Sequence, residues 1–490
     1  MLMTEGTEKR IRSGIDGLDT VLHGGFVPNR AYMVTGRPGT GKTILGLHYL
    51  TAGDPNGSRL FVNLEESEED VRTNAAKLGF DLTAVTFLDL SPESDVFTDN
   101  RQYDIFGADE VEGPEVTATI EERVRESNPD RVFIDPLTQL RNLAPDGYQF
   151  RKQINGLTQF FKQQDATVLF TSQATTRAPD DDLQYVSDGT IELARSDVTR
   201  TLSVPKFRGS ATESGAHSVR ITDDGMCVYP VLTPDAHQQE FTAESISSGV
   251  PEIDHILHGG IERGTVTILS GPTGVGKTTL GTQFMKEAAG RGERSVIYMF
   301  EEDRKTLFSR SKSVNIPAGT MAERGTLAVE EVEPLDKSPA EFASMVRTEV
   351  EQHDTEIVMI DGIDGYRLSL HGAEDDLERE LNSLGRYLKN MGIAVILVDS
   401  VDSVTGQFKP TNSGLSYLAD NIIFLRYLEM HGELQKAIGI LKKRTTNFER
   451  SLRQFEITQH GITVGDPLSG LRGILSGSPE FTKSERGDDG

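Results

Sequence analysis

The sequence predicts an α/β protein of two tandem domains, each with a mainly parallel, doubly wound sheet and an antiparallel extension. Three observations predict this fold class. The second half of the chain repeats, in the same order, the motifs of the first half. Within each half, short apolar runs alternate with amphipathic stretches. In each half, a glycine-rich segment separates a strand candidate from a helix candidate, as in parallel α/β units.

The repeat is the strongest of these observations. For example, GRPGTGKT at 36–43 recurs as GPTGVGKT at 271–278. Six ordered motifs recur at offsets between 226 and 236, which indicates a tandem duplication rather than a short-period solenoid. We therefore expect a first domain at 1–235, a second domain at 236–475 and a flexible acidic tail at 476–490.

The first half shows the alternation of strands and helices most clearly. Its strand candidates lie at 31–35, 59–63, 85–88, 131–134 and 167–171. Helical patterns fall between them, for example at 41–50 and 149–163. Buried β-rich runs separated by helices are typical of parallel strands covered on both faces. After Asp188 and Ile422 the pattern changes to short strands with turn signals, which predicts the antiparallel extension.

Composition and charge disfavour several classes of protein, among them nucleic-acid-binding, disulfide-bonded and membrane-inserted proteins. The 490 residues carry a net charge of −26, which disfavours a protein that mainly grips nucleic-acid phosphates. Such a charge is typical of proteins that work in concentrated salt, and an ordinary acidic cytosolic protein is the alternative. The single cysteine, Cys227, excludes an intramolecular disulfide and a cysteine-based zinc site. The polar N-terminus and short apolar runs predict a cytoplasmic protein without membrane insertion.

Both glycine-rich segments fit the P-loop pattern G-x-x-x-x-G-K-[ST] between a strand and a helix. Glycines allow backbone N–H groups to curl round phosphates, and the helix N-terminus adds positive potential. An accidental glycine-rich turn is the alternative, but two matches at corresponding places disfavour it. The predicted ATP-binding residues are Gly36, Gly39, Thr40, Gly41, Lys42 and Thr43, and then Gly271, Gly274, Val275, Gly276, Lys277, Thr278 and Thr279.

Asp135 and Asp361 each close an apolar strand, where a strand end meets the nucleotide crevice. With the hydroxyls of Thr43 and Thr278 they form the predicted Mg²⁺ sites. The alternative is a structural role, because an aspartate at this place can also cap the helix that follows.

Two pairs of glutamates, Glu65 with Glu66 and Glu301 with Glu302, end another strand in each half. A carboxylate there can orient and deprotonate the water that attacks the γ-phosphate, so these residues are the predicted catalytic groups. The alternative is a solvated helix N-terminus, where acidic side chains are favoured by the helix dipole.

Two late basic pairs, Lys206 with Arg208 and Lys442 with Arg444, also recur. In rings of P-loop subunits, such residues can reach the γ-phosphate bound by the next subunit. We therefore predict that they contact nucleotide in trans. A charged strand face is the alternative.

At these residues the chain resembles the KaiC family of clock ATPases and its archaeal relatives, within the RecA-like superfamily. The resemblance spans 11–482 and includes SGIDGLD, FVNLEES, FIDPLTQL, YVSDGTIEL and KFRGS in the first half, and YMFEED and LADNIIFLRYLEMHGE in the second. It implies two tandem RecA-like domains, a double-ring homohexamer with ATP between subunits, and slow ATP hydrolysis. It also implies autokinase activity in the second domain.

The same resemblance assigns the glutamate pairs to hydrolysis in the first domain and to hydroxyl activation in the second. It places a possible phosphoacceptor at Ser416, whereas Tyr417 departs from the Ser-Thr pair of the family. Two other functions remain as alternatives. One is a DNA recombinase or helicase motor, which the acidic loop at 173–188 disfavours. The other is an ATP-assembled scaffold that binds a protein signalling partner without significant catalysis.

Overall fold

The structure is a computed structural model that describes residues 10–54, 57–91, 112–173, 180–196, 199–333, 337–368, 374–401, 415–430, 432–469, 471–472 and 480–481. The chain divides into two compact units, Met1–Val231 and Leu232–Gly490. The short 3₁₀ helix η3 (Pro234–Ala236) belongs to the second unit, because Asn390 Nδ2 donates to the Pro234 carbonyl over 2.9 Å. The boundary therefore lies slightly before the predicted one.

The described part of the first unit holds a nine-stranded sheet in the order β3-β2-β4-β5-β1-β6-β7-β8-β9. Strands β1 to β6 pair in parallel, and β7 to β9 continue the sheet in antiparallel fashion. The parallel strands are short and apolar, as buried strands must be when both faces are covered. Their bounds are β1 Ala31–Gly36, β2 Arg59–Asn63, β3 Thr86–Asp89, β4 Arg131–Asp135, β5 Thr167–Ser172, β6 Gly189–Arg195, β7 Arg200–Phe207, β8 His217–Thr222 and β9 Gly225–Tyr229.

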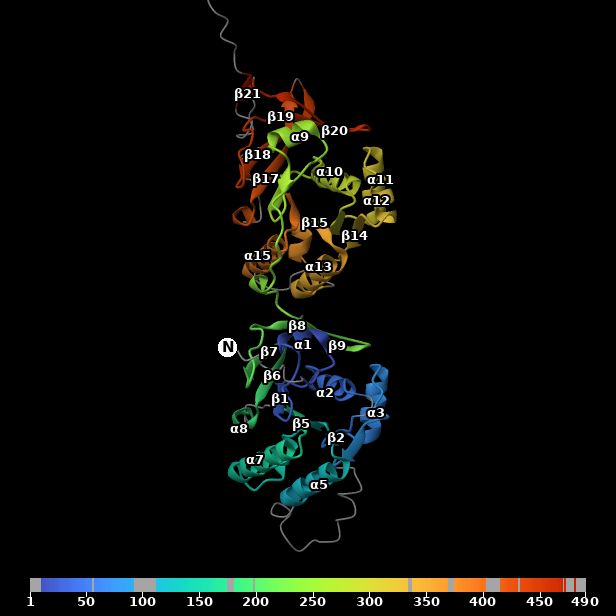
Figure 1. Cartoon of the computed structure of the whole chain (residues 1–490), viewed down its shortest axis with the longest axis vertical. Coiled ribbons are helices and arrows are strands. Elements are labelled where there is room, and N and C mark those ends of the chain that lie inside the picture. Colours follow the sequence, from blue (N-terminus) through green and yellow to red (C-terminus); the bar gives the residue numbers. More distant parts are fainter. Residues whose placement is uncertain are drawn as a thin grey trace, which may run out of the picture. The chain divides into compact units, whose positions relative to one another are not determined.

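Helices cover both faces of this sheet (Figure 1). Side chains of α2 and α3 join one apolar cluster with one face of the strands, and side chains of α5 and α7 join a second cluster with the other face. The burial of these apolar faces is the main driving force for the layered arrangement. The helix bounds are α1 Asp16–Val21, α2 Lys42–Thr51, α3 Glu68–Lys77, α5 Glu112–Ser127, α6 Gln139–Asn142, α7 Gly147–Gln163 and α8 Asp181–Val186.

The second unit repeats this architecture within its described residues. Its nine-stranded sheet has the order β14-β13-β15-β16-β12-β17-β18-β19-β20, which matches the first sheet strand for strand. The sheet strands are β12 Val266–Gly271, β13 Arg294–Met299, β14 Leu327–Glu331, β15 Thr355–Asp361, β16 Ala394–Ser400, β17 Asn421–Met430, β18 Glu433–Lys443, β19 Arg453–Thr458 and β20 Gly461–Pro467. Two short antiparallel pairs join β10 Ser245–Ile246 to β11 Ile261–Glu262, and β21 Leu471–Arg472 to β22 Glu480–Phe481.

The helices of the second unit also form two layers, with two apolar clusters on the two faces of its sheet. Their bounds are α9 Pro251–Ile256, α10 Lys277–Gly290, α11 Arg304–Ser313, α12 Ala318–Glu323, α13 Pro339–His353, α14 Ile363–Leu368, α15 Glu374–Asn390 and the 3₁₀ helix η4 Leu415–Tyr417. In the part of the chain that the structure describes, no helix is long and apolar enough to cross a membrane.

The predicted fold class is confirmed. The strand candidates of the first half all fall on strands, and the residues after Asp188 and Ile422 include the predicted antiparallel strands. One detail differs: β6 and β17 themselves still pair in parallel with the central strands β1 and β12. The antiparallel part therefore begins one strand later. Strand β22 falls inside the segment that we expected to be a flexible tail.

Candidate functional site

The first P-loop joins β1 to α2. Gly39 and Gly41 have φ angles of 76° and 105°, a backbone conformation that L side chains rarely adopt. A Cβ on Gly41 would also lie 2.7 Å from Met226 Cε, so the tight turn requires glycine. The loop thus brings the backbone N–H groups and the N-terminus of α2 to one place, which suits the binding of an anion.

Lys42 is the first residue of α2, and its ammonium turns back over the loop. Nζ donates to the carbonyl oxygens of Gly36 at 2.8 Å and Arg37 at 3.2 Å. Burial lowers the pKa of Lys42, while the carboxylates of Asp135 and Glu65 act in the opposite direction. The ammonium therefore lies between the P-loop and the carboxylates that follow the strands, Asp135 and Glu65.

Asp135 ends β4 beside the P-loop. Its Oδ2 accepts a 2.6 Å hydrogen bond from Thr43 Oγ1, and its Oδ1 accepts one from Thr171 Oγ1 at the end of β5. Burial raises the pKa of Asp135, and the two threonine hydrogen bonds oppose that rise. A threonine hydroxyl joined to a buried carboxylate is a donor set of hard oxygens, which fits Mg²⁺. Thr43 and Asp135 would hold the ion there.

Glu65 and Glu66 follow β2 and are exposed at the edge of the same site. Gln173, directly after β5, donates from Nε2 to Glu65 Oε2 over 2.8 Å and so holds this carboxylate. Burial raises the pKa of Glu66, and the charges of Asp135 and Glu65 raise it further. A carboxylate with a raised pKa is a better general base near neutral pH.

These groups line one pocket of about 480 Å³ in the first unit. The pocket brings together the predicted lysine, threonine, aspartate and both glutamates of the first half. Its lining residues are Pro38, Gly39, Gly41, Lys42, Thr43, Ile44, Phe61, Asn63, Glu65, Glu66, Val71, Asp135, Gln173, Arg200 and Ile221.

The second P-loop has the same local geometry between β12 and α10. Gly274 and Gly276 have φ angles of 78° and 115°, and Lys277 Nζ donates to the Gly271 carbonyl over 2.8 Å. Asp361 ends β15 and accepts a hydrogen bond from the Thr278 side chain. Burial raises the pKa of Asp361 to about 6, while the Thr278 hydrogen bond and the charge of Arg310 lower it.

The second glutamate pair differs from the first. Glu302 follows β13, and its two carboxylate oxygens face the guanidinium of Arg310 on α11. Arg310 Nη1 lies 3.0 Å from Oε1 and Nη2 lies 2.8 Å from Oε2. Glu301 is exposed beside it. The structure thus supplies an ion pair with one hydrogen bond, from Nη1 to Oε1, in the second site, which the sequence analysis did not predict.

The late basic residues lie away from the P-loop of their own unit. Lys206 Nζ donates to the carbonyl oxygens of Gln184 at 2.5 Å and Ser187 at 2.6 Å, and Arg208 lies 3.7 Å from Asp188. They therefore fix the end of α8 to β7. The predicted contact with a neighbouring subunit remains a prediction.

Their counterparts in the second unit fix the segment that carries Ser416. Lys442 Nζ donates to the Ser416 carbonyl over 2.7 Å, and Arg444 donates to the Tyr417 carbonyl over 3.0 Å. Ser416 is half-buried within η4, and Tyr417 is exposed. The residues 402–414, between β16 and η4, lie outside the described residues.

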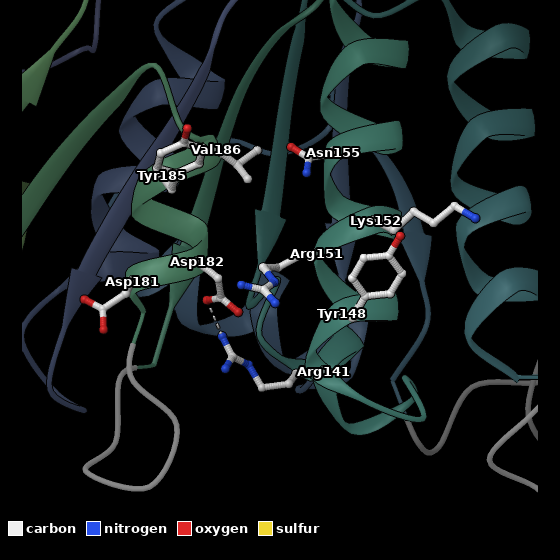
Figure 2. A pocket seen from close by; sticks show the side chains of 9 residues that line it. All are labelled: Arg141, Tyr148, Arg151, Lys152, Asn155, Asp181, Asp182, Tyr185 and Val186. Atoms are coloured by element: carbon white, nitrogen blue, oxygen red, sulfur yellow. Dashed lines mark hydrogen bonds and ion pairs between the residues drawn. The ribbon is translucent and has the colours of Figure 1, made fainter.

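A larger hollow, of about 820 Å³, lies elsewhere in the first unit, between α6, α7 and α8. Figure 2 shows Arg151 on α7 pointing toward α8, whereas the side chain of Lys152 extends away from α8, and Arg141 is joined to Asp182. The Arg141–Asp182 contact is 2.7 Å long. This hollow contains neither the P-loop nor the glutamates, and the predicted site residues of the first unit line the smaller pocket instead.

Sequence reasoning missed three functional candidates: Thr171, Gln173 and Arg310. Thr171 is the last residue but one of β5 and Gln173 directly follows this strand, which pairs with the P-loop strand β1. Polar residues at the end of a parallel strand were a usable signal. Arg310 stands eight residues after Glu302 on a helix, and only the structure shows that the helix turns this side chain toward the carboxylate.

The fold and the two sites define the class of P-loop nucleoside triphosphatases. The family model described as "ATPase: KaiC" matches residues 11–233 and again 246–469. The chain belongs to the KaiC family, and its two units are tandem RecA-like domains.

Named relatives agree with this family. The circadian clock oscillator protein KaiC of Picosynechococcus sp. is 28% identical over 96% of this chain and 92% of its own length. The protein of the same name from Synechococcus elongatus is 27% identical over 96% of this chain and 92% of its own length. The circadian clock protein KaiC3 of Synechocystis sp. is 26% identical over 98% of this chain and 96% of its own length.

Proposed function

We propose that this chain is a KaiC-type regulatory protein that binds ATP with Mg²⁺ in both units and hydrolyses it slowly. The observation that carries the proposal is the pocket that joins Lys42, Thr43, Asp135 and two glutamates around a glycine-rich turn. The second unit repeats the lysine, the threonine–aspartate pair and the glutamates.

In the proposed reaction, a water oxygen attacks the γ-phosphorus of ATP and the bond to the β–γ bridging oxygen breaks. The products are ADP, which keeps the bridging oxygen, and inorganic phosphate. Glu65 or Glu66 accepts the proton of the water, while Lys42 and the loop N–H groups hold the phosphates. Mg²⁺ would neutralise phosphate charge beside Thr43 and Asp135.

The test is ATP turnover and ATP binding by the full chain in molar KCl with Mg²⁺. Replacing all four glutamates together, Glu65→Gln with Glu66→Gln and Glu301→Gln with Glu302→Gln, should abolish turnover and keep ATP binding, because an amide cannot accept the proton. Lys42→Ala with Lys277→Ala should remove binding as well. ATP binding without any turnover in the wild-type protein would favour the scaffold instead.

We also propose that the chain forms a ring, a homohexamer by analogy with the KaiC proteins, in which Lys206, Arg208, Lys442 and Arg444 contact nucleotide in trans. All four lie away from the P-loop of their own unit, and the side chains of Arg208 and Arg444 are exposed, which supports this idea. Mixing Lys42→Ala subunits with Arg208→Ala subunits tests this idea. Partial recovery of turnover supports trans contacts, and no recovery counts against them.

Autophosphorylation in the second unit is a finer proposal. Lys442 lies on β18 and donates to the Ser416 carbonyl. If Lys442 contacts the nucleotide of a neighbouring subunit, the Ser416 hydroxyl is therefore also brought toward that nucleotide. Transfer would form a bond from Ser416 Oγ to the γ-phosphorus and release ADP, with the hydroxyl proton passing to Glu301 or Glu302. Phosphopeptide mapping after incubation with Mg-ATP tests this step. Phosphate at Ser416, lost in Glu301→Gln with Glu302→Gln, supports it.

The net charge of −26 supports two further parts of the proposal: work in concentrated salt, and no nucleic-acid partner. We place the protein in the cytoplasm, with a protein signalling partner. Unfolding in low salt with recovery in molar KCl would support salt adaptation. Stimulation of turnover by single-stranded DNA would instead favour a DNA motor.

A further inference from the structure

The two units present their second glutamate in different surroundings. In the first unit, the described residues provide no ion pair for the Glu66 carboxylate, which is exposed at the pocket edge. In the second unit, the guanidinium of Arg310 takes both oxygens of Glu302, at 3.0 and 2.8 Å. The difference concerns the second glutamate of each pair, which in the proposed reaction can accept the proton of the attacking water.

The local fold shows that Asn74 is the counterpart of Arg310. Helices α3 and α11 both begin two residues after the glutamate pair, are ten residues long and start with a side-chain cap. The cap is Ser67 in the first unit and Asp303 in the second. Eight residues after Glu66 stands Asn74, and eight residues after Glu302 stands Arg310. The same helix position therefore carries a short neutral side chain in one unit and a cation in the other.

Arg310 Nη1 donates a hydrogen bond to Glu302 Oε1, and the second nitrogen, Nη2, makes an ion-pair contact with Oε2. A charge-assisted hydrogen bond of this kind restricts the position and direction of the carboxylate. The pair engages both oxygens of Glu302, so neither oxygen can accept a proton from water without weakening a charge-assisted contact. The side chain of Arg310 is 40% exposed and that of Glu302 is 20% exposed. Solvent therefore reaches this pair, and we expect it to open at a moderate cost.

We propose that Arg310 is a positioning residue that holds Glu302 away from the attacking water and thereby slows ATP hydrolysis in the second unit. The inference rests on the proposed function. While the pair is intact, only Glu301 accepts the proton of the attacking water in the second unit. When the contact with Arg310 is broken, Glu302 becomes a second proton acceptor.

The test isolates the second unit in the full chain with Glu65→Gln and Glu66→Gln. In this background, Arg310→Asn copies the first unit at the equivalent position. We expect kcat to rise at least about threefold with KM for ATP unchanged, because only proton acceptance becomes easier. Arg310→Lys keeps the charge but lacks a second nitrogen to contact Oε2, and it should give an intermediate kcat. Lys312→Asn, which removes a charge from an exposed position of the same helix, should leave kcat unchanged.

A double-mutant cycle shows whether Arg310 acts through Glu302. When Glu302→Gln is already present, Arg310→Asn should have no effect on kcat. The reciprocal change, Asn74→Arg with Glu301→Gln and Glu302→Gln present, should lower turnover in the first unit. An unchanged or lower kcat in Arg310→Asn, or a gain that persists without Glu302, would overturn the proposal.

The failure of the proposed function looks different from the failure of this inference. If no variant and no wild-type protein hydrolyses ATP, both fail together. If the first unit hydrolyses ATP while Arg310→Asn and Asn74→Arg have no effect, only the role of Arg310 fails.

Discussion

The two P-loop sites of this chain share the loop backbone and its lysine but differ in several side chains at and after the strand ends. Lys42 and Lys277 each donate to the glycine carbonyl that precedes their loop, at 2.8 Å in both units. The φ angles of the two middle loop glycines agree within a few degrees, at 76° and 78°. The phosphate-binding scaffold is thus set by backbone geometry, which glycines and a helix N-terminus suffice to define.

The groups at the strand ends differ between the units. The parallel registers of the β1–β5 and β12–β16 pairs place Val398 where the first unit has Thr171, and Ser400 where it has Gln173. Asp135 therefore accepts a hydrogen bond that Val398 cannot give to Asp361. Duplicated domains can keep a binding scaffold and still diverge in the residues that govern catalysis.

The units also diverge in how they fill equivalent places near the sheet. In the second unit, Lys443 Nζ lies 2.6 Å from Glu262 and donates to the Gly260 carbonyl over 2.8 Å. By the registers with β6 and β17, the counterpart of Lys443 is Phe207, which stacks on Tyr32 with ring centroids 5.3 Å apart. The second unit thus has a buried ion pair where the first unit has an aromatic contact.

The largest effect is expected at this buried pair. Lys443→Met should lower the free energy of unfolding of the second unit by about 3–5 kcal/mol, because Glu262 would remain buried without its cation. Lys443→Met with Glu262→Leu should recover most of that loss, because the first unit is folded with an apolar side chain, Phe207, at the position of Lys443. Chemical denaturation in molar KCl measures both variants. A double variant as unstable as the single one would contradict this explanation.

A smaller effect is expected when the first site is made like the second. Gln173→Ser removes the 2.8 Å hydrogen bond that holds Glu65. Turnover in a Lys277→Ala background should fall about tenfold, with ATP binding retained, because the carboxylate loses its orientation. Gln163→Ser, at an exposed position of α7, is the matched control. Equal turnover in both variants would show that Gln173 does not position Glu65.

The smallest effect concerns pH. Burial raises the pKa of Asp361 from 3.8 to about 6, so the metal-free folded protein binds a proton that the unfolded chain releases. This group stabilises the fold at low pH, and the contribution is lost as the pH rises through about 6. Between about pH 5.5 and about pH 7.5, the wild-type protein should lose about 1 kcal/mol relative to Asp361→Asn, in EDTA. If the free energies of unfolding of the wild-type protein and of Asp361→Asn change equally with pH, the raised pKa of Asp361 would be contradicted.

The sequence was sufficient for the fold class and for the main groups of the first site. The P-loop pattern places Lys42 and Thr43, and the apolar strand before Asp135 places that carboxylate next to them, because parallel strands end at one edge. The contacts of Gln173 and Arg310 were beyond this reasoning. They depend on which rotamer each side chain adopts and on the direction of a helix relative to the sheet, neither of which a pattern of residue types specifies.

The most direct test of the account is the comparison of ATP turnover in Lys42→Ala and Lys277→Ala, each as the full chain in molar KCl with Mg²⁺. The account predicts that Lys277→Ala keeps most of the wild-type turnover, because the first site retains an oriented Glu65 and a Glu66 carboxylate for which the described residues provide no ion pair. Lys42→Ala should lose at least about 90% of it. Equal turnover in the two variants, or a larger loss in Lys277→Ala, would contradict the claim that the side chains at the strand ends make the first site the faster one.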